Sequence, residues 1–381
     1  MIKLLESLRK KITPEINYIL IIFLFTRVML TIIGCLSYII LDPKLPPRKY
    51  EITFSKHLWL DVWGVWDTFW YVDIATRGYS TAPPPIAGLE HQANYPFFPL
   101  YPILMKVLGT LIGDNFIAGI ILSNIFMIAA CIFIYKLVKL NSDEDTALRS
   151  IKYLFLFPTA FILSGVFTEP LFLALTIICF YYAKKDKWHI VGIMGFLVSL
   201  TRPNGFWLIL PLSYEYLRQK HFSLRNIRID VLYLLLLPLG FGLFYLYVAY
   251  LTKDPWAFSH IQSAWNVEFD NPLRVLWKGF FSHKTNYLFA TYFTTVWLVF
   301  LTVSYRKIDF SQWLFGMYMI LVPLSAGLDA IPRYILPVFP LYILLAQIKK
   351  DSPLDQAVTI SLALLQGFLM VFWAMNFDLI V

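Results

Sequence analysis

Long apolar runs separated by short charged breaks recur from one end of the chain to the other. Each run is about 15 to 25 residues long, which is the length that an α-helix needs to cross the hydrocarbon core of a bilayer. The pattern therefore predicts an all-α integral membrane protein with about eleven to twelve transmembrane helices.

The length criterion assigns about eleven of these runs to the bilayer. Several of them are only about 15 residues long, so they must tilt, thin the bilayer or meet a re-entrant break. The predicted spans are residues 17–41, 115–139, 152–167, 169–183, 188–201, 204–217, 231–251, 287–304, 309–327, 334–348 and 356–376.

The distribution of Lys and Arg predicts the orientation, because basic residues accumulate in cytoplasmic loops. The loops agree with one another when the N-terminus is cytoplasmic and residues 97–113 lie on the membrane surface instead of crossing it. The basic N-terminal stretch precedes an apolar run without a small-residue cleavage site. We therefore expect a first span here and not a removable signal peptide.

This orientation divides a single membrane domain, residues 1–381, into successive segments. After the first span, an extracytoplasmic loop at 42–114 carries Pro-rich breaks around aromatic stretches, and we expect it to hold helices lying in the membrane interface. A helical bundle covers 115–251, a second extracytoplasmic loop covers 252–286, and the last spans cover 287–376.

The composition excludes a water-soluble fold, because 59% of the 381 residues are hydrophobic and only 15% are charged. The formal charge of +8 is informative through its distribution among the loops and does not imply a nucleic-acid partner. Cys35, Cys131 and Cys179 all lie in apolar runs without CxxC spacing. Neither a disulfide framework nor a thiolate metal site is therefore expected.

The first outer loop carries three acidic residues in an aromatic setting. Asp61, Asp67 and Asp73 are regularly spaced within HLWLDVWGVWDTFWYVDIATRGYS, residues 57–80. A carboxylate in a partly desolvated aromatic surface is a candidate for a catalytic base. The alternative is the polar face of an interfacial helix that is anchored by its tryptophans.

Two short motifs interrupt apolar stretches on the outer side. GVFTEP, residues 165–170, places Glu169 at a junction of two spans, where a charge is a functional hypothesis or a helix-start acid favoured by the macrodipole. LTRPNG, residues 200–205, places Arg202 where its guanidinium could bind two phosphate oxygens. A snorkelling arginine in an outer turn is the alternative for Arg202.

Charged residues also occur in a third motif near the outer side and at one position deep in the first span. LDAIPRYILPVFP, residues 328–340, brings Asp329 and Arg333 to the same face, where Arg333 is a second phosphate cation or an interfacial anchor. Arg27 lies in the middle of the first span, and we expect it to pair inside the bundle.

The second outer loop carries groups suited to sugars. Asp254, Gln262 and Trp265 combine carboxylate, amide and indole side chains within TKDPWAFSHIQSAWNVEFD, residues 252–270. The outer histidines show no HExxH or HxxH spacing, so a catalytic zinc is not expected. The acids of the first loop could in principle hold Mg²⁺, but we expect no metal and no other cofactor.

Four motifs, near residues 67, 169, 202 and 333, thus fall on one face under an orientation derived from charge alone. An acid in a long outer loop beside arginines at a lipid-accessible face suggests group transfer from a lipid phosphate. A transporter or flippase would place ionisable residues near the bilayer midplane, as Arg27 does. A non-catalytic scaffold would give no reason for these charges to gather.

Several motifs occur together in a known family. They are WDTFWYVDIATRGYS (66–80), YPFFPLYP (95–102), FTEPLF (167–172), TRPNG (201–205), DPWAFSHIQSAW (254–265) and, more loosely, PRYILPVFP (332–340). In this combination the chain resembles the PIG-V-like mannosyltransferases of the GT-C glycosyltransferase superfamily.

The resemblance implies a GT-C fold of about a dozen helices, with the first outer loop in the active site. It implies a polyprenyl- or dolichyl-phosphate-linked sugar as donor, most often mannose, and Asp67 as catalytic base. The family's eukaryotic members add the second mannose of the GPI anchor core in the endoplasmic reticulum. This chain is shorter than those, so we expect a prokaryotic relative in a plasma membrane with another acceptor, which is a glycan, a glycolipid or a protein.

The expected reaction is an inverting displacement on the extracytoplasmic side. Asp67 would deprotonate the acceptor hydroxyl, Arg202 and Arg333 would stabilise the departing phosphate, and Glu169 would bind hydroxyls or orient Arg202. The residues expected to contact substrates are Asp61, Trp66, Asp73, Glu169, Arg202, Asn204, Asp254, Gln262, Trp265 and Arg333.

Overall fold

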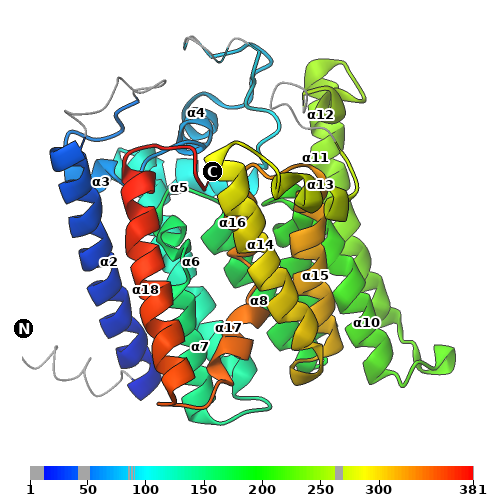
Figure 1. Ribbon diagram of the computed structural model, residues 1–381. Coiled ribbons are helices and arrows are strands. Elements are labelled where there is room, and N and C mark those ends of the chain that lie inside the picture. Colours follow the sequence, from blue (N-terminus) through cyan, green and yellow to red (C-terminus); the bar gives the residue numbers. More distant parts are fainter. Residues whose placement is uncertain are drawn as a thin grey trace, which may run out of the picture.

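The computed structural model describes residues 13–41, 52–84, 86, 89, 91–261 and 269–380. Within these residues the chain is helical and contains no strand, which confirms the predicted all-α class (Figure 1). With η marking 3-10 helices, the elements are α2 (Pro14–Leu41), α3 (Leu58–Asp61), α4 (Thr68–Arg77), α5 (Leu100–Ile112), α6 (Asn115–Val138), α7 (Glu144–Leu156), η2 (Ala160–Ser164), α8 (Glu169–Lys184), α9 (Trp188–Ser199), η3 (Pro203–Leu208), α10 (Ile209–Gln219), η4 (Leu224–Asn226), η5 (Ile229–Leu235), α11 (Leu236–Thr252), α12 (Ala257–His260), α13 (Pro272–Gly279), α14 (Thr285–Val303), η7 (Tyr305–Lys307), α15 (Phe310–Ser325), α16 (Ile331–Ile335), α17 (Pro340–Ala346) and α18 (Pro353–Ala374).

Five helices in the described part of the chain are long and apolar enough to cross a bilayer. They are α2, α6, the continuous η5–α11 segment, α14 and α18, and each overlaps a predicted span. The helices α5, α9 and α15 are apolar but shorter. An integral membrane protein is therefore supported by length and composition.

Two predicted spans are broken by prolines. The span expected at 152–167 is wrong, because α7 ends at Leu156, directly before Phe157 and Pro158, and the 3-10 helix η2 follows. The span expected at 334–348 is divided between α16 and α17, with Pro337 between them. Proline removes a backbone donor and disfavours helix before it, so an apolar run alone overestimates helix length.

Polar side chains from distant helices satisfy the backbone of the first break. Gln366 of α18 donates from Nε2 to the carbonyls of Phe155 and Phe157, at 2.8 and 2.9 Å. Arg27 of α2 donates from Nη1 to the carbonyl of Ala160 in η2 at 3.1 Å. Carbonyl groups freed inside an apolar bundle need such partners. The deep charge at Arg27 thus has a structural partner.

Several short helices gather at one end of the bundle. The elements α3, α4, α12, α13 and α16 lie at this end in Figure 1, and the chain after α18 turns toward α16 there. α4 packs on α5 and α6, while α16 packs on α14 and α15. Segments from the first outer loop, the second outer loop and the C-terminal part of the chain are thereby brought together.

Candidate active site

Two acids and two arginines form one ion-pair network at this end of the bundle. Arg333 donates from Nη1 to Asp67 Oδ2 at 2.5 Å. Its Nε lies 3.3 Å from Glu169 Oε1, and Arg202 Nη1 lies 2.7 Å from the same oxygen. Glu169 therefore joins the two arginines, and Arg333 joins the two acids.

Each of these side chains is placed by a break in helical structure. Asp67 precedes the first residue of α4, but its side chain makes no capping bond to that helix, so the carboxylate is available to Arg333. Trp66 before it has a left-handed backbone with φ of 49°, which is uncommon for a bulky residue. Glu169 begins α8, and Arg202 is extended directly before the proline that starts η3.

The network is buried except at Asp67. The side chains of Glu169, Arg202 and Arg333 are 1%, 6% and 8% exposed, whereas that of Asp67 is 22% exposed. Charges buried to this extent require partners, and here two guanidinium groups balance two carboxylates. Asp67 is the one member of the network that presents an open face to a reactant.

The electrostatic setting keeps Arg333 charged. Burial by itself would lower the pKa of the Arg333 guanidinium, but the carboxylates of Asp67 and Glu169 outweigh burial and raise its pKa well above the ordinary value. The guanidinium carbon of Arg333 also lies 5.4 Å from the ring centre of Phe167 and 5.3 Å from that of Tyr334. These ring contacts fix the plane of the fork that faces Asp67.

Arg202 is held by the same tyrosine. Its guanidinium carbon lies 4.8 Å from the ring centre of Tyr334, so this ring lies within cation–π distance of both arginines. Nothing in the sequence pattern singles out Tyr334, since it is one of 23 tyrosines in the chain. Its position next to Arg333 in α16 is the one signal that could have identified it.

The network forms part of the wall of a large cavity of about 1720 Å³. Trp66, Asp67, Arg202, Asn204 and Arg333 all line it. Pockets for a single small ligand usually measure about 300 to 1,000 Å³, so this cavity has room for more than one reactant.

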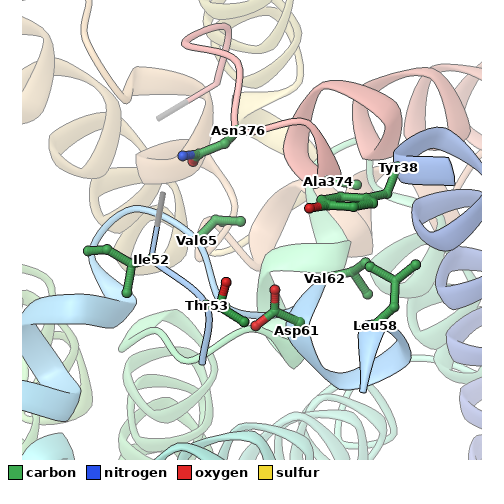
Figure 2. A pocket seen from close by; sticks show the side chains of 10 residues that line it. Tyr38, Ile52, Thr53, Leu58, Asp61, Val62, Val65, Ala374 and Asn376 are labelled. Atoms are coloured by element: carbon green, nitrogen blue, oxygen red, sulfur yellow. The ribbon is translucent and has the colours of Figure 1, made fainter. Parts of the chain in front are cut away.

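Asp61 has a local structural role and does not line the large cavity. Its Oδ1 accepts hydrogen bonds from the backbone N–H groups of Phe54 and Ser55, at 2.7 and 2.9 Å. It lines a separate cavity of only about 30 Å³ together with Tyr38, Thr53 and Asn376 (Figure 2). Its carboxylate orders the chain leading into α3.

Asp73 also lies outside the large cavity. It pairs with Arg77 one turn later in α4, and its Oδ2 accepts a hydrogen bond from Asn94 Nδ2 at 2.7 Å. Asn94 in turn donates to the carbonyl of Gly78 at 3.0 Å. Asp73 thus ties α4 to the chain that leads into α5.

The second outer loop places Asp254 at the surface. Its carboxylate accepts a hydrogen bond from the Trp256 backbone at 2.9 Å and lies 2.7 Å from His260 Nδ1. The Trp256 N–H, then His260, lower the pKa of the Asp254 carboxyl. Gln262 and Trp265, expected as sugar contacts, lie outside the residues that the structure describes.

The described residues contain no group of three His, Cys, Asp or Glu side chains that could hold a metal ion. The two acids of the network are already paired with guanidinium groups. A divalent cation at this point would have to displace Arg333 or Arg202.

Comparisons with known proteins bear on the fold. No family model matches the chain, and no curated protein matches it. The PIG-V-like assignment therefore stays a prediction.

Two solved structures align with most of the chain. ArnT from Cupriavidus metallidurans, bound to undecaprenyl phosphate, aligns with a TM-score of 0.53 at 11% identity, over 90% of this chain and 62% of ArnT. The oligosaccharyltransferase of Archaeoglobus fulgidus, tethered with an acceptor peptide, aligns with a TM-score of 0.44 at 12% identity, over 93% of this chain and 55% of its own. The chain spans less than two thirds of either protein. At this identity the likeness to ArnT concerns the fold, and it confirms the predicted GT-C architecture.

Proposed function

We propose that this protein is a membrane glycosyltransferase that moves a hexose, specifically mannose, from a polyprenyl- or dolichyl-phosphate-linked donor to an acceptor hydroxyl. The observation that carries the proposal is the network in which Glu169 joins two buried guanidinium groups, Arg202 and Arg333, beside the cavity-facing carboxylate of Asp67. Displacement of a phosphate by a hydroxyl calls for a base and for fixed cations close together.

In the proposed step, Asp67 takes the proton of the acceptor hydroxyl as its oxygen forms a bond to the anomeric carbon. The bond from that carbon to the phosphate oxygen breaks, and its electron pair leaves with the lipid phosphate. Attack opposite the leaving group inverts the anomeric configuration. A glycosidase protonates its alkoxide leaving group, but the polyprenyl phosphate released from the donor is a stable anion that leaves without a proton, so one base suffices.

The two arginines would stabilise the negative charge that develops on the departing phosphate. Before donor binding, Arg333 is engaged by Asp67. A donor phosphate competes for Arg333 and adds negative charge to a network that is otherwise balanced. Donor binding would therefore loosen the pair and free the carboxylate of Asp67 to contact the acceptor hydroxyl.

Several observations support the lipid-linked donor and the site of action. ArnT, which is similar in fold, is bound to undecaprenyl phosphate in its solved structure. The motifs shared with the PIG-V-like mannosyltransferases favour mannose. The charge distribution favours a cytoplasmic N-terminus and an extracytoplasmic active site, in a prokaryotic plasma membrane or, for a eukaryotic protein, the endoplasmic reticulum.

We propose that the reaction needs no metal ion, because guanidinium groups already occupy the positions beside both acids. The competing transporter or flippase function drew its support from Arg27 near the middle of the first span. That side chain is committed to the Ala160 carbonyl and the Ser164 hydroxyl, both at 3.1 Å. Its place in the bundle is explained without a transport pathway.

The test is transfer of radiolabelled mannose from synthetic polyprenyl-phosphate-mannose to endogenous lipid or protein acceptors by the purified protein in detergent. Label moved by the wild type and not by Asp67→Asn supports donor, reaction and base together. If neither protein moves label but both bind or translocate the lipid phosphate, the flippase function replaces the enzyme.

A further inference from the structure

The large cavity has a second polar wall that the proposed displacement does not use. It is built where three segments meet: the start of α14, the residues before α16 and the chain after α18. We call it the polar wall, and its members are Lys284, Asn286, Tyr287, Asp329, Asn376 and Asp378.

The members of the polar wall have hydrogen-bonding capacity to spare. Tyr287 donates from its hydroxyl to Asp329 Oδ2 at 3.0 Å, and Asn286 Nδ2 lies 3.5 Å from Asp378 Oδ2. The two aspartates are exposed, and neither forms an ion pair among the described residues. Asn376 Oδ1 is buried from solvent without a hydrogen-bond partner there. Unused acceptors at a cavity wall are suited to binding donors on a ligand.

Another part of the lining is aromatic. Phe69, Trp70, Phe97, Trp207 and Phe258 present aromatic surface to the same cavity. Such surface suits an isoprenoid chain and offers little to a polar ligand. The lining therefore contains an aromatic part, the ion-pair network and the polar wall.

We propose that the polar wall is the acceptor subsite and that the acceptor is a sugar residue of a glycan or glycolipid. The inference rests on the proposed function, which leaves the acceptor open. Carboxylates and amides accept and donate to several hydroxyl groups at once, and the rings of Tyr287 and Phe377 give flat faces for the C–H side of a sugar. A serine side chain of a protein acceptor has one hydroxyl and would leave most of these groups unpaired.

The position of the polar wall relative to the base agrees with this role. Asp329 lies two residues before α16 and Arg333 lies within it, so one short segment contributes to both the acceptor subsite and the ion-pair network. A sugar held by Asp329 and Asp378 in the cavity that Asp67 faces can present a hydroxyl to that base. Holding both reactants in one cavity supplies the orientation that the displacement requires.

The test uses the purified full-length protein, polyprenyl-phosphate-mannose as donor and two acceptor probes, octyl α-mannoside and an octyl-linked serine peptide. The wild type should transfer label to the mannoside in preference to the peptide. Asp329→Asn and Asp378→Asn should each raise the KM for the mannoside roughly tenfold or more, the effect of losing a hydrogen bond to a charged group. The KM for the donor and the affinity for undecaprenyl phosphate should stay within about twofold.

The matched control is Asp270→Asn. Asp270 is an acid of the second outer loop that pairs with Lys278 at 2.8 Å and is not among the residues that line the cavity. Loss of lipid-phosphate affinity in Asp329→Asn or Asp378→Asn, or an unchanged mannoside KM in both, overturns the subsite. Transfer by the wild type to the peptide or to water alone overturns the sugar acceptor and leaves the proposed function intact. Absence of any transfer removes the proposed function itself.

Discussion

Arg333 donates to Asp67 at 2.5 Å although the two residues are 266 positions apart in the chain. Because Asp67 and Glu169 raise its pKa, Arg333 stays protonated at every pH at which the protein can be handled. The pair contributes stability below the ordinary Arg pKa and loses it only as pH rises through the raised value, so it persists throughout the neutral range. Asp67 is therefore held by a permanent cation until another anion competes for it.

Replacement of Asp67 by Asn should reduce mannose transfer by about 10²- to 10⁴-fold, the usual contribution of a general base. The amide keeps the shape of the carboxylate and still accepts a hydrogen bond from Arg333, so the protein should fold. Transfer rates and thermal melting in detergent measure the two effects. Asp270→Asn, which changes an acid outside the cavity, should keep the wild-type rate. Wild-type turnover in Asp67→Asn would exclude Asp67 as the base.

Glu169→Gln should act on the positions of the arginines. The substitution leaves two guanidinium groups buried against the single charge of Asp67, and breaking a buried ion pair in this way costs about 3 to 5 kcal/mol. We expect a lower melting temperature and a raised donor KM. The double variant Glu169→Gln with Arg202→Gln removes the unpaired cation, so it should regain stability without regaining donor affinity. A double variant no more stable than Glu169→Gln alone would contradict this account.

The sequence predicted which residues belong to this network, but not how they contact one another. Lys and Arg counts and run lengths placed Asp67, Glu169, Arg202 and Arg333 near one face, and the structure joins them directly. The pattern could not show that Glu169 bridges both arginines, because contacts between breaks far apart in the chain depend on how the helices pack.

The regular spacing of the three aspartates also suggested that all of them contact substrates, but two of them do not line the large cavity. Asp61 and Asp73 share the aromatic setting of Asp67, yet each is committed to local partners, the first to backbone N–H groups and the second to Arg77 and Asn94. Side-chain direction decides between these roles, and regular spacing along the chain does not determine it. The sequence did not identify Asp378 as a site residue, because acidic residues commonly follow the last apolar run of a membrane protein.

Arg27→Met should lower stability and leave catalysis unchanged. The substitution removes the donor to the Ala160 carbonyl inside the bundle, and an unsatisfied buried group costs about 1 to 3 kcal/mol. Thermal melting in detergent should fall, while the KM for donor and the turnover number of the folded fraction should match the wild type. If Arg27→Met abolished movement of a lipid phosphate across a vesicle membrane and the protein remained folded, a transport function would regain its support.

The last prediction concerns the pH dependence of acceptor binding. Desolvation by the surrounding cavity wall, then the neighbouring carboxylate of Asp329, raise the pKa of the Asp378 carboxyl, while Lys284 lowers it. If ionised Asp378 binds sugar hydroxyls, the acceptor KM should rise as pH falls through this raised pKa. The rise should therefore begin above the ordinary Asp value of about 3.9. We call this rise of the acceptor KM toward low pH the acidic limb of the profile, and Asp378→Asn should remove it.

Two further variants should move that limb in opposite directions. Asp329→Asn removes a charge that raises the pKa of Asp378, so the acidic limb should shift to lower pH. Lys284→Met removes a charge that lowers the pKa of Asp378, so the acidic limb should shift to higher pH. Loss of the proposed base at Asp67 would instead change the turnover number, so steady-state measurement of both constants separates the roles of the two carboxylates. Shifts in the same direction for both variants would show that a group other than Asp378 controls acceptor binding.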